Sequence, residues 1–326
     1  MIYFIVNEKS QTGKGADVWN KVRNRLDDRH IDYRHFVTRY RGHATYLASK
    51  ISNLNREHVN IVVVGGDGTV NETINGIKDF EKVRLGLIPA GSGNDFARGL
   101  GVKGDCEQLI DELIDGVCAL EDKKSIQGAM EKYTDRIDLG CLTIGRSREK
   151  RYFCISAGIG MDAIVCKKAL TSRLKKLLNR VHMGKLTYLV LTIITLFSMN
   201  TYNVSVDFSD GRKRHLRKMI FSAAMNQKAE GGGVPMAPKA DPRDGKLSMC
   251  SAHGIPKWKT FFILPFLVAA KHERFDGMEV MNFEKAVFHS DRPVTLHADG
   301  EYCGDIKEFS VRCEKGKLCM LKNYFC

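Results

Sequence analysis

The sequence predicts an α/β N-terminal domain with a mostly parallel sheet, followed by a largely antiparallel β-sandwich domain. Up to about residue 120, short apolar runs alternate with amphipathic segments, which is the rhythm of βαβ units. Beyond that point apolar and polar residues alternate singly between turn signals, as in antiparallel strands. A chain of 326 residues is also long enough to bury two cores.

The first half alternates strands and helices along the chain. A helix is also expected in CEQLIDELIDG, because its apolar residues share one helical face, and Gly116 is its expected C-terminal stop. We expect strands at residues 2–6, 33–37, 61–64 and 85–88, and helices at residues 16–29, 43–52 and 69–78.

The second half follows the period of two residues that strands have. YNVSVDF alternates strictly and then reaches Asp210-Gly211, which predicts a hairpin. AVFHSDRPVTLHADGEY and FSVRCEKGKLCML are expected to form further short strands. The polar, lysine-rich stretch at residues 120–135 marks the boundary. We therefore expect domains at residues 1–133 and 134–313, with a tail at about 314–326 that packs back on the first.

The composition indicates which classes of binding partner and which cellular compartment to expect. A net charge of +13 favours nucleic acid, nucleotide phosphates or an anionic membrane surface. The ten cysteines form no C-x-x-C pair, and MIYFIVNEKS lacks the features of a signal peptide, so we expect reduced thiols in a cytoplasmic protein. The longest apolar run, LTYLVLTIITLF at residues 186–197, is too short to span a bilayer.

Two glycine-rich loops follow consecutive predicted strands. VNIVVVGGDGTVNETINGI turns at Gly65-Gly66-Asp67-Gly68, and LGLIPAGSGNDFARGLG repeats the pattern around Asp95. Where parallel strands end, glycines let backbone N–H groups approach phosphates, and a helix N-terminus favours anions. A carboxylate beside a phosphate needs a cation between them, and Mg²⁺ is the natural choice. A structural turn is the alternative explanation for either loop taken alone. Neither loop is a Walker A motif.

These blocks resemble a known family. GGDGTVNE at residues 65–72 and PAGSGNDFA at 89–97 resemble the signature loops of the diacylglycerol kinase catalytic-domain family, which includes soluble bacterial lipid kinases and the sphingosine and ceramide kinases. The resemblance implies an α/β nucleotide-binding domain and a β-rich lipid-substrate domain. The other blocks that match, in order, are NEKSQTGKG, TRYRGHA, RIDLG, SAGIGMDA, EGGGVPMAPKADPRDGKL and HADGEY.

The resemblance implies an ATP-dependent lipid kinase, with diacylglycerol converted to phosphatidic acid as the leading reaction. Asp299 and Glu301 would be the catalytic acids, one of which takes the proton of the attacking hydroxyl. The implied nucleotide-binding residues are Asn7, Ser10, Gly13, Thr38, Gly65, Gly66, Asp67, Gly68, Thr69, Val70, Asn71, Glu72 and Ser92. The implied ligands of a catalytic Mg²⁺, bound through waters, are Asp67, Asp95 and Asp138. For a structural Mg²⁺ the resemblance implies the carboxylate of Asp244 and main-chain carbonyl oxygens near Asp241 and Lys246.

Basic residues gather just before the longest apolar run. A basic amphipathic helix there suits an anionic membrane surface, so we expect a cytoplasmic enzyme that associates peripherally with membranes. Residues 186–197 and WKTFFILPFLVAA are expected to be core helices or to line an acyl chain. The basic residues are Lys167, Lys168, Arg173, Lys175, Lys176, Arg180 and Lys185.

Several alternatives stay open. The acceptor could be another lipid, namely phosphatidylglycerol, a sphingoid base or undecaprenol. NAD kinases also use a G-G-D-G-T loop, so an NAD kinase-like enzyme is the nearest rival. A nucleic-acid-binding module is not favoured, because the basic stretch from Lys167 to Lys185 has no aromatic residue for stacking on bases. A catalytically silent regulator or lipid carrier that retains the fold is a further alternative, and a homodimer through an edge strand is a possible assembly.

Overall fold

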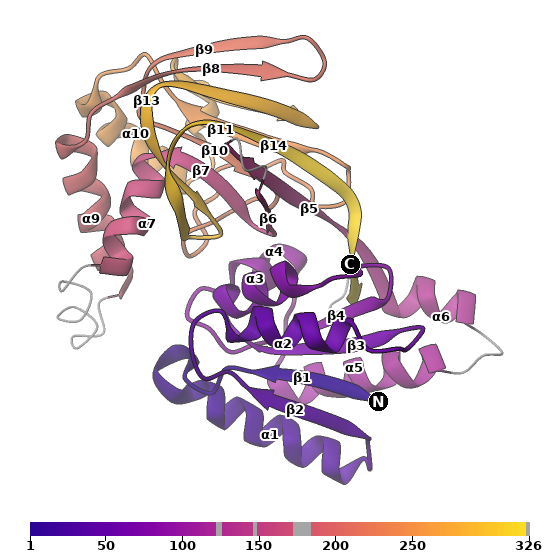
Figure 1. The fold of residues 1–326 in the computed structure, drawn as a ribbon. Coiled ribbons are helices and arrows are strands. Elements are labelled where there is room, and N and C mark those ends of the chain that lie inside the picture. The colour runs from indigo at the N-terminus through magenta and orange to yellow at the C-terminus, as the bar shows by residue number, and fades with distance from the viewer. Residues whose placement is uncertain (122–125, 146–148, 172–183, 324–326) are drawn as a thin grey trace. The chain divides into compact units, whose positions relative to one another are not determined.

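The computed structural model describes residues 1–121, 126–145, 149–171 and 184–323 (Figure 1). The chain divides into two compact units. Unit 1 comprises Met1–Asp138 together with Lys315–Cys326, and unit 2 comprises Leu139–Glu314. Unit 1 is therefore built from two separate stretches of the chain.

Unit 1 is a parallel sheet with helices on both faces, as predicted. Its strands lie in the order β2, β1, β3, β4, and the end of β14 continues the sheet through the parallel pairs Cys319↔Arg84 and Met320↔Leu85. The elements of unit 1 before residue 134 are β1 (Ile2–Val6), a 3-10 turn (Ser10–Gly13), α1 (Lys14–Asp28), β2 (Tyr33–Val37), α2 (His43–Ser52), β3 (Val59–Gly65), α3 (Asp67–Gly76), β4 (Val83–Pro89), α4 (Asp95–Leu100), α5 (Cys106–Glu121) and α6 (Ile126–Tyr133).

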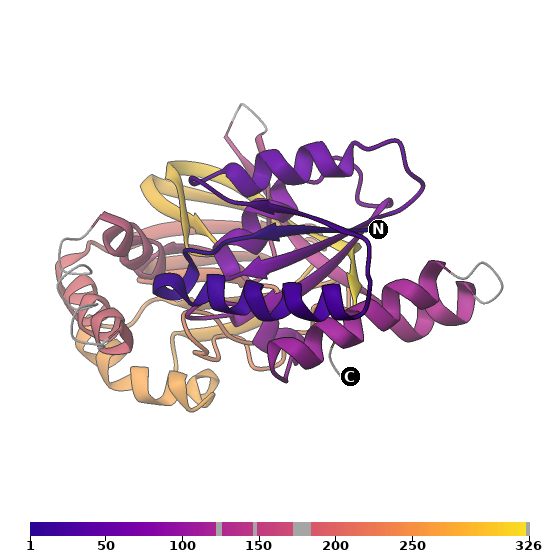
Figure 2. The same ribbon diagram turned by 90° about the horizontal axis from the view of Figure 1, so that it is seen from below.

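Apolar side chains on both faces bury the central strands of this sheet, whereas its edge strand β2 stays partly exposed. All five residues of β1 and all seven of β3 are buried, which is what covering helices on both sides require. Figure 2 shows α1 and α5 on one side of the sheet and α2 on the other. The core under α1 and α5 includes Phe4, Trp19, Val62 and Leu113.

The prediction that Gly116 ends a helix was wrong. Helix α5 continues through Gly116 to Glu121. A Cβ on Gly116 would lie 3.3 Å from the Cβ of Tyr133, so the glycine lets α6 approach α5 closely. The polar stretch at residues 120–135 contains the whole of helix α6.

Unit 2 is built from antiparallel strands, as predicted. Its strands run in the order β12, β11, β10, β7, β13, β14, while β8 and β9 extend from β13 and β6 pairs with β5. The elements are β5 (Thr134–Ile144), β6 (Glu149–Phe153), β7 (Ser156–Gly160), α7 (Met161–Thr171), α9 (Gly184–Ser198), β8 (Tyr202–Phe208), β9 (Lys213–Met219), β10 (Phe221–Met225), β11 (Leu247–Ala252), α10 (Lys257–Val268), a 3-10 turn (His272–Arg274), β12 (Met278–Phe283), β13 (Lys285–Ala298) and β14 (Glu301–Leu321).

Two hairpins organise the strands of unit 2. The Asp210-Gly211 hairpin is confirmed, with Gly211 at φ +87° between β8 and β9. The expectation of short strands after residue 285 was wrong, because β13 has 14 residues and β14 has 21. A register shift between His289 and Val294 bends this long pair without ending it.

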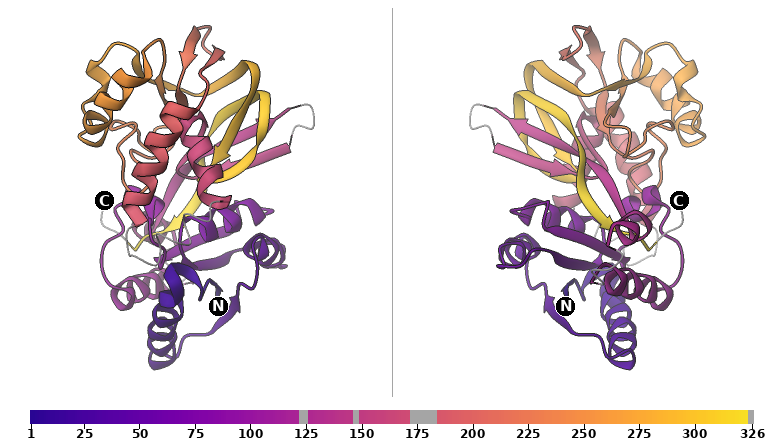
Figure 3. Two further views of the ribbon diagram at one scale, coloured as in Figure 1. Left: turned by 90° about the vertical axis from the view of Figure 1, so that its left-hand side faces the viewer. Right: turned by 90° about the vertical axis from the view of Figure 1, so that its right-hand side faces the viewer.

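Helices α7, α9 and α10 of unit 2 lie together (Figures 1 and 3). Much of the predicted basic helix, residues 172–183, lies outside the described residues. Of its described lysines, Lys167 pairs with Asp305 at 2.8 Å and Lys168 donates to Thr195 Oγ1 at 3.1 Å. Among the described helices, none is long and apolar enough to cross a membrane. The nine described cysteines are free, and Cys118 is the exposed one among them.

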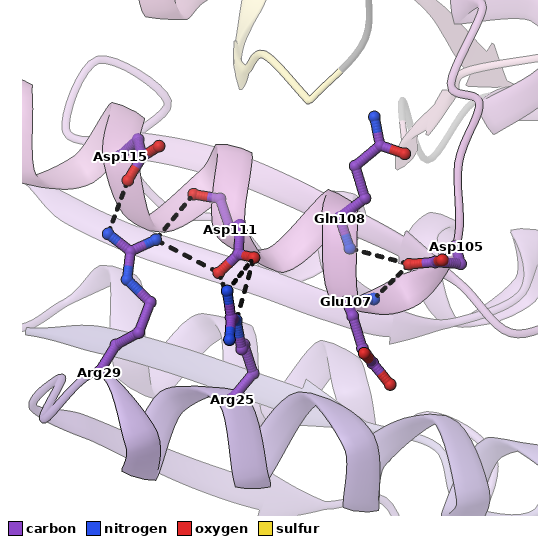
Figure 4. A network of polar contacts seen from close by, with 7 residues as sticks. All are labelled: Arg25, Arg29, Asp105, Glu107, Gln108, Asp111 and Asp115. Carbon is purple, nitrogen blue, oxygen red and sulfur yellow. Dashed lines mark hydrogen bonds and ion pairs between the residues drawn. The ribbon is translucent and has the colours of Figure 1, made fainter.

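An ion-pair cluster joins α1 to α5 (Figure 4). Arg25 donates to both carboxylate oxygens of Asp111 at 2.8 Å, and Arg29 bonds Asp115 at 2.7 Å and Asp111 at 3.3 Å. The hydrogen bond from Arg25 lowers the pKa of Asp111, although partial burial opposes this shift. The folded protein is therefore more stable when Asp111 is ionised than when it is protonated.

We predict that Asp111→Asn lowers the free energy of unfolding by about 1 kcal/mol at neutral pH, because it removes the bidentate partner of Arg25. A carboxylate with a lowered pKa in the folded state stabilises the protein above its unfolded pKa of about 3.9 and loses that effect as the pH falls further. Urea denaturation should therefore give a constant difference between parent and variant down to about pH 5, and a shrinking one at lower pH.

The matched control is Asp115→Asn, which removes a single hydrogen bond from a more exposed carboxylate. We expect it to change stability by less than half as much. Equal losses in the two variants, or a loss in Asp111→Asn that stays the same at acid pH, would contradict the role given to Asp111.

Candidate active site

A cavity of about 380 Å³ lies in unit 1 where β1, β2 and β3 end. Parallel strands collect ligands at their carboxyl ends, and the volume suits a small organic ligand. The cavity is lined by Asn7, Lys9, Ser10, Thr38, Arg39, Tyr40, Arg41, Gly66, Gly68, Thr69 and Glu72.

The structure separates the predicted nucleotide-binding residues into two groups. Val70 and Asn71 are only 1% and 2% exposed, because they point into the core under α3. The predicted residues that line the cavity are Asn7, Ser10, Thr38, Gly66, Gly68, Thr69 and Glu72. The predicted residues outside its lining are Gly13, Gly65, Asp67, Val70, Asn71 and Ser92.

Four cavity residues were missed from the sequence: Lys9, Arg39, Tyr40 and Arg41. The last three directly follow Thr38, which comes immediately after β2 and was itself predicted. A cluster of cations at the carboxyl end of a parallel strand was the available signal, since that end is where an anionic ligand binds. Three of the four carry positive charge, so the cavity suits phosphate.

The glycines of the first loop have different structural roles. A Cβ on Gly65 would lie 2.9 Å from the side chain of Thr69, and one on Gly91 would lie 2.4 Å from the Cα of Gly66. Gly66 and Gly91 therefore allow the two loops to touch through their backbones. A Cβ on Gly68 would meet no heavy atom within 4 Å, so the space above this residue is open toward the cavity.

Asp67 fastens the two loops together. Its carboxylate accepts hydrogen bonds from the backbone N–H groups of Asp95 and Phe96, both at 3.1 Å, at the start of α4. A carboxylate at that position satisfies helix donors that have no partner within the helix. Asp95 is 8% exposed and pairs with Arg98, which also donates to the carbonyl of Gly93.

Glu72 holds the loop that follows β2. Its carboxylate accepts hydrogen bonds from the backbone of Gly42 at 2.8 Å and of Ala44 at 3.2 Å. Just after β1, Asn7 donates to Thr69 Oγ1 at 3.0 Å. Ser10 Oγ is buried and has no hydrogen-bond partner among the described residues, so a ligand could engage it without breaking an existing bond.

Two of the three expected ligands of a catalytic Mg²⁺ come together. A Cβ on Gly93 would lie 3.2 Å from Asp67 Oδ2 and 3.7 Å from Asp95 Oδ2, so both carboxylates reach the same place. Asp138 is fully buried and accepts a hydrogen bond from the backbone of Gly316 at 2.6 Å. Paired carboxylates of this kind are the donors that a hydrated Mg²⁺ prefers, so Asp67 and Asp95 fit the ion.

In unit 2, the predicted acids Asp299 and Glu301 flank the turn between β13 and β14. Asp299 adopts φ +47° and Gly300 φ +80°, which makes this turn tight. The carboxylate of Asp299 accepts hydrogen bonds from the backbone N–H groups of Cys154 at 2.9 Å, Ile155 at 2.8 Å and Ser156 at 3.0 Å. Asp299 therefore fixes the turn to the start of β7.

His297 also contacts the Asp299-Gly300 turn, and the sequence analysis did not assign it this role. It is 2% exposed, its Nε2 lies 3.0 Å from Asp162 Oδ2, and its Nδ1 faces the N–H of Gly300 at 3.3 Å. Burial lowers the pKa of His297, but the hydrogen bond and charge of Asp162 raise it more, so the pKa lies above the usual value. A Cβ on Gly158 would lie 2.0 Å from Asp162 Oδ2, so only glycine leaves room for this pair.

Glu230 completes a cluster with Asp162 and His297. Of the described residues, these three form a group whose ligand atoms all lie within 4.8 Å of one another. Glu230 also accepts a hydrogen bond from Ser156 Oγ. The oxygen and nitrogen atoms that a metal ion would need are therefore partly engaged already, in the Ser156–Glu230 and His297–Asp162 hydrogen bonds.

The expected structural Mg²⁺ ligands lie in an exposed turn between β10 and β11. Asp241 accepts a hydrogen bond from the N–H of Arg243 at 3.1 Å, and Asp244 accepts one from the N–H of Lys246 at 2.8 Å. Gly245 at φ +78° closes the turn and brings Asp241, Asp244 and Lys246 into one loop.

Comparison with known proteins places both halves of the chain. Residues 1–121 match the diacylglycerol kinase catalytic domain, and residues 155–321 match the YegS C-terminal NAD kinase beta sandwich-like domain. YtlR of Bacillus subtilis (strain 168), described as a candidate lipid kinase, is 28% identical over 304 residues, which are 93% of this chain and 93% of YtlR. A diacylglycerol kinase of Mycobacterium tuberculosis (strain ATCC 25618 / H37Rv) is 25% identical over 244 residues, 74% of this chain and 70% of that protein.

A solved structure shares the fold. The crystal structure of a diacylglycerol kinase from Bacillus anthracis str. Sterne has a TM-score of 0.65 and 17% identity, and the match covers 98% of this chain and 96% of that one. At this level of identity the likeness concerns the fold alone.

We predict that Gly91→Ala and Gly68→Ala have opposite effects on stability. The new Cβ at residue 91 would lie 2.4 Å from the backbone of Gly66, so the loops must separate, at a cost of roughly 1–3 kcal/mol. The Cβ at residue 68 meets nothing and favours helix α3, which should stabilise by about 0.5–1 kcal/mol. Thermal unfolding of the two variants measures both effects, and a destabilised Gly68→Ala variant would contradict the open space described above residue 68.

Proposed function

The chain belongs to the diacylglycerol kinase catalytic-domain family, and on that basis we propose that it transfers the γ-phosphate of ATP to the hydroxyl of a lipid. Diacylglycerol is the leading acceptor, which would make phosphatidic acid the product. The names of the relatives support a lipid as the acceptor class. The observation that carries the proposal is the cationic cavity beside Gly68.

The cavity offers what a bound triphosphate requires. Gly68 leaves its backbone accessible at the start of α3, where helix N–H groups attract anions. Lys9, Arg39 and Arg41 add positive charge along the lining. Phosphoryl transfer depends mainly on positioning and charge neutralisation, so a rigid loop with these groups suits the reaction.

Unit 2 would supply the groups for the acceptor. In the proposed reaction the lipid oxygen bonds to the γ-phosphorus, the bond from that phosphorus to the bridging oxygen breaks, and ADP leaves with the electron pair. The hydroxyl proton passes to a carboxylate of the Asp299-Gly300-Glu301 turn. Asp299 and His297 hold that turn in place through the contacts described above. A divalent cation held by Asp67 and Asp95 would neutralise phosphate charge when bound.

NAD is a second candidate acceptor. The match of residues 155–321 to a domain described as NAD kinase beta sandwich-like favours it. The acceptor hydroxyl would then be on a nucleoside sugar, and the same carboxylate chemistry would apply.

We expect labelled-phosphate transfer from ATP to one member of an acceptor panel in mixed micelles. The panel holds diacylglycerol, phosphatidylglycerol, sphingosine, ceramide and undecaprenol, with NAD assayed in solution. Asp299→Asn and Glu301→Gln should each lower turnover about 100-fold. Asp299→Asn should also lower Tm, because an amide cannot accept all three backbone hydrogen bonds, whereas Glu301→Gln serves as the folded control. Label on NAD and on no lipid would overturn the lipid proposal.

We further expect Gly68→Ala to weaken ATP binding at least about tenfold while the variant stays folded, because its methyl group fills the space proposed for phosphate. Isothermal titration with a non-hydrolysable ATP analogue measures the affinity. The control is Gly211→Ala, which adds the same methyl group in the β8–β9 hairpin of unit 2. Because Gly211 adopts φ +87°, we expect this variant to lose some stability while its ATP affinity stays unchanged. If Gly68→Ala and the parent bound ATP with equal affinity, the loop at Gly68 would not be the phosphate-binding site.

A further inference from the structure

Exposed apolar side chains of unit 2 gather on two helices. In the described part of this unit, every exposed large hydrophobic residue lies on α9 or α10. Soluble proteins rarely leave such side chains in contiguous groups unless the group contacts a partner. We call the set the α9–α10 face; it consists of Val190, Ile194, Phe197, Trp258, Phe261, Phe262 and Val268.

The exposed residues follow helical spacing. On α10, Trp258, Phe261, Phe262 and Val268 share one side of the helix with the exposed Pro265. Thr260, Ile263 and Leu267 point to the opposite side and are buried. Helix α10 is thus apolar on the side that faces water as well as on the side that faces the core. On α9, the residues at positions 190, 194 and 197 repeat the same spacing.

The two helices present one continuous surface. The ring centroids of Phe197 on α9 and Phe261 on α10 lie 6.2 Å apart, and those of Phe261 and Phe262 lie 5.5 Å apart. Trp258 joins the same aromatic group through Phe262 at 6.4 Å. Lys257 ties the helix ends together, because its Nζ donates to the carbonyls of Phe197 and Met199. Figures 1 and 3 show α9 and α10 side by side.

Positive charge borders both ends of the exposed side of α10. Lys257 and Lys259 lie in its first turn, and Lys271 and Arg274 follow its last. Two acids also lie here: Glu273, which pairs with Lys239 at 3.3 Å, and the exposed Asp276, so the four cations outnumber them. The border of the α9–α10 face is therefore cationic around an aromatic centre.

We propose that the α9–α10 face docks the protein on an anionic lipid bilayer, with α9 and α10 lying in the plane of the membrane surface. An apolar face with aromatic residues and a basic border is the pattern of interfacial helices. A second copy of this chain fits less well, because a two-fold axis would bring two cationic borders together. The choice of a bilayer rests on the proposed function, since a lipid kinase must reach an acceptor that resides there.

The surface differs from the one expected from the sequence. The basic stretch before α9 was the predicted docking element, and its described members Lys167 and Lys168 contact Asp305 and Thr195. The residues of the α9–α10 face were predicted to be core or to line an acyl chain, yet Trp258 is 62% exposed and Phe262 64%.

The test is sedimentation with vesicles, in the absence of ATP. The parent protein should bind mixed vesicles that contain phosphatidylglycerol and phosphatidylcholine in equal amounts. The double variant Trp258→Ser, Phe262→Ser should bind them about tenfold more weakly with an unchanged Tm, because both side chains are exposed. Lys271→Gln should weaken binding to these vesicles more than binding to phosphatidylcholine alone. The control is Tyr46→Ser, which removes an exposed aromatic ring from α2 in unit 1.

A soluble acceptor separates docking from catalysis. The double variant should phosphorylate a short-chain, water-soluble diacylglycerol as the parent does, and act less on the same lipid in vesicles. Equal vesicle binding by parent and double variant would overturn the docking proposal, whatever the kinase assay shows. A parent dimer that the double variant converts to monomers, with vesicle binding unchanged, would assign the face to a second copy. Vesicle binding that depends on the face, without phosphorylation of any lipid, would support docking and overturn the proposed function.

Discussion

The contact between the two glycine loops is the constraint on which the candidate site of unit 1 depends. Gly66 and Gly91 approach so closely that a single methyl group on either would reach the other's backbone. The carboxylate of Asp67 then holds the first residues of α4, which brings Asp95 beside it. The rigidity of this corner leaves the open space over Gly68 with a fixed shape, and a fixed shape is what positioning a phosphate requires.

Much of unit 1 could be predicted because local pattern and tertiary structure agree there. The apolar run Ile61–Val64 within β3 and the amphipathic period of α2 are the same signals that the folded sheet needs. The prediction that Gly116 ends a helix was wrong because this glycine is needed for a tertiary contact: it makes room for Tyr133, and no local sequence pattern shows that contact. The cations Arg39 and Arg41 were missed although they lie within the quoted block TRYRGHA, because only Thr38 of that block was assigned a role and the sequence does not show which side chains face the cavity.

The acidic residues of the candidate site could be named from the sequence, but their hydrogen-bond partners could not. These partners lie far away in the sequence and decide what each acid does. Asp299 bonds the backbone of residues 154–156, and His297 bonds Asp162, across more than a hundred intervening residues in each case. A lone histidine or aspartate carries no sign of such partners. The exposure of α10 was equally unreadable, because its composition is apolar on all sides and only the fold decides which side is covered.

Strand β14 has a consequence for how the chain reaches its final structure. It leaves the turn at Asp299-Gly300 within unit 2 and ends beside β4 in unit 1, where Asn323 donates to the carbonyl of Leu87. The sheet of unit 1 is therefore missing a strand until unit 2 has been synthesised. During translation the exposed edge of β4 must wait on the ribosome for a partner that emerges later, and a fragment cut after residue 138 would keep that edge open to aggregation.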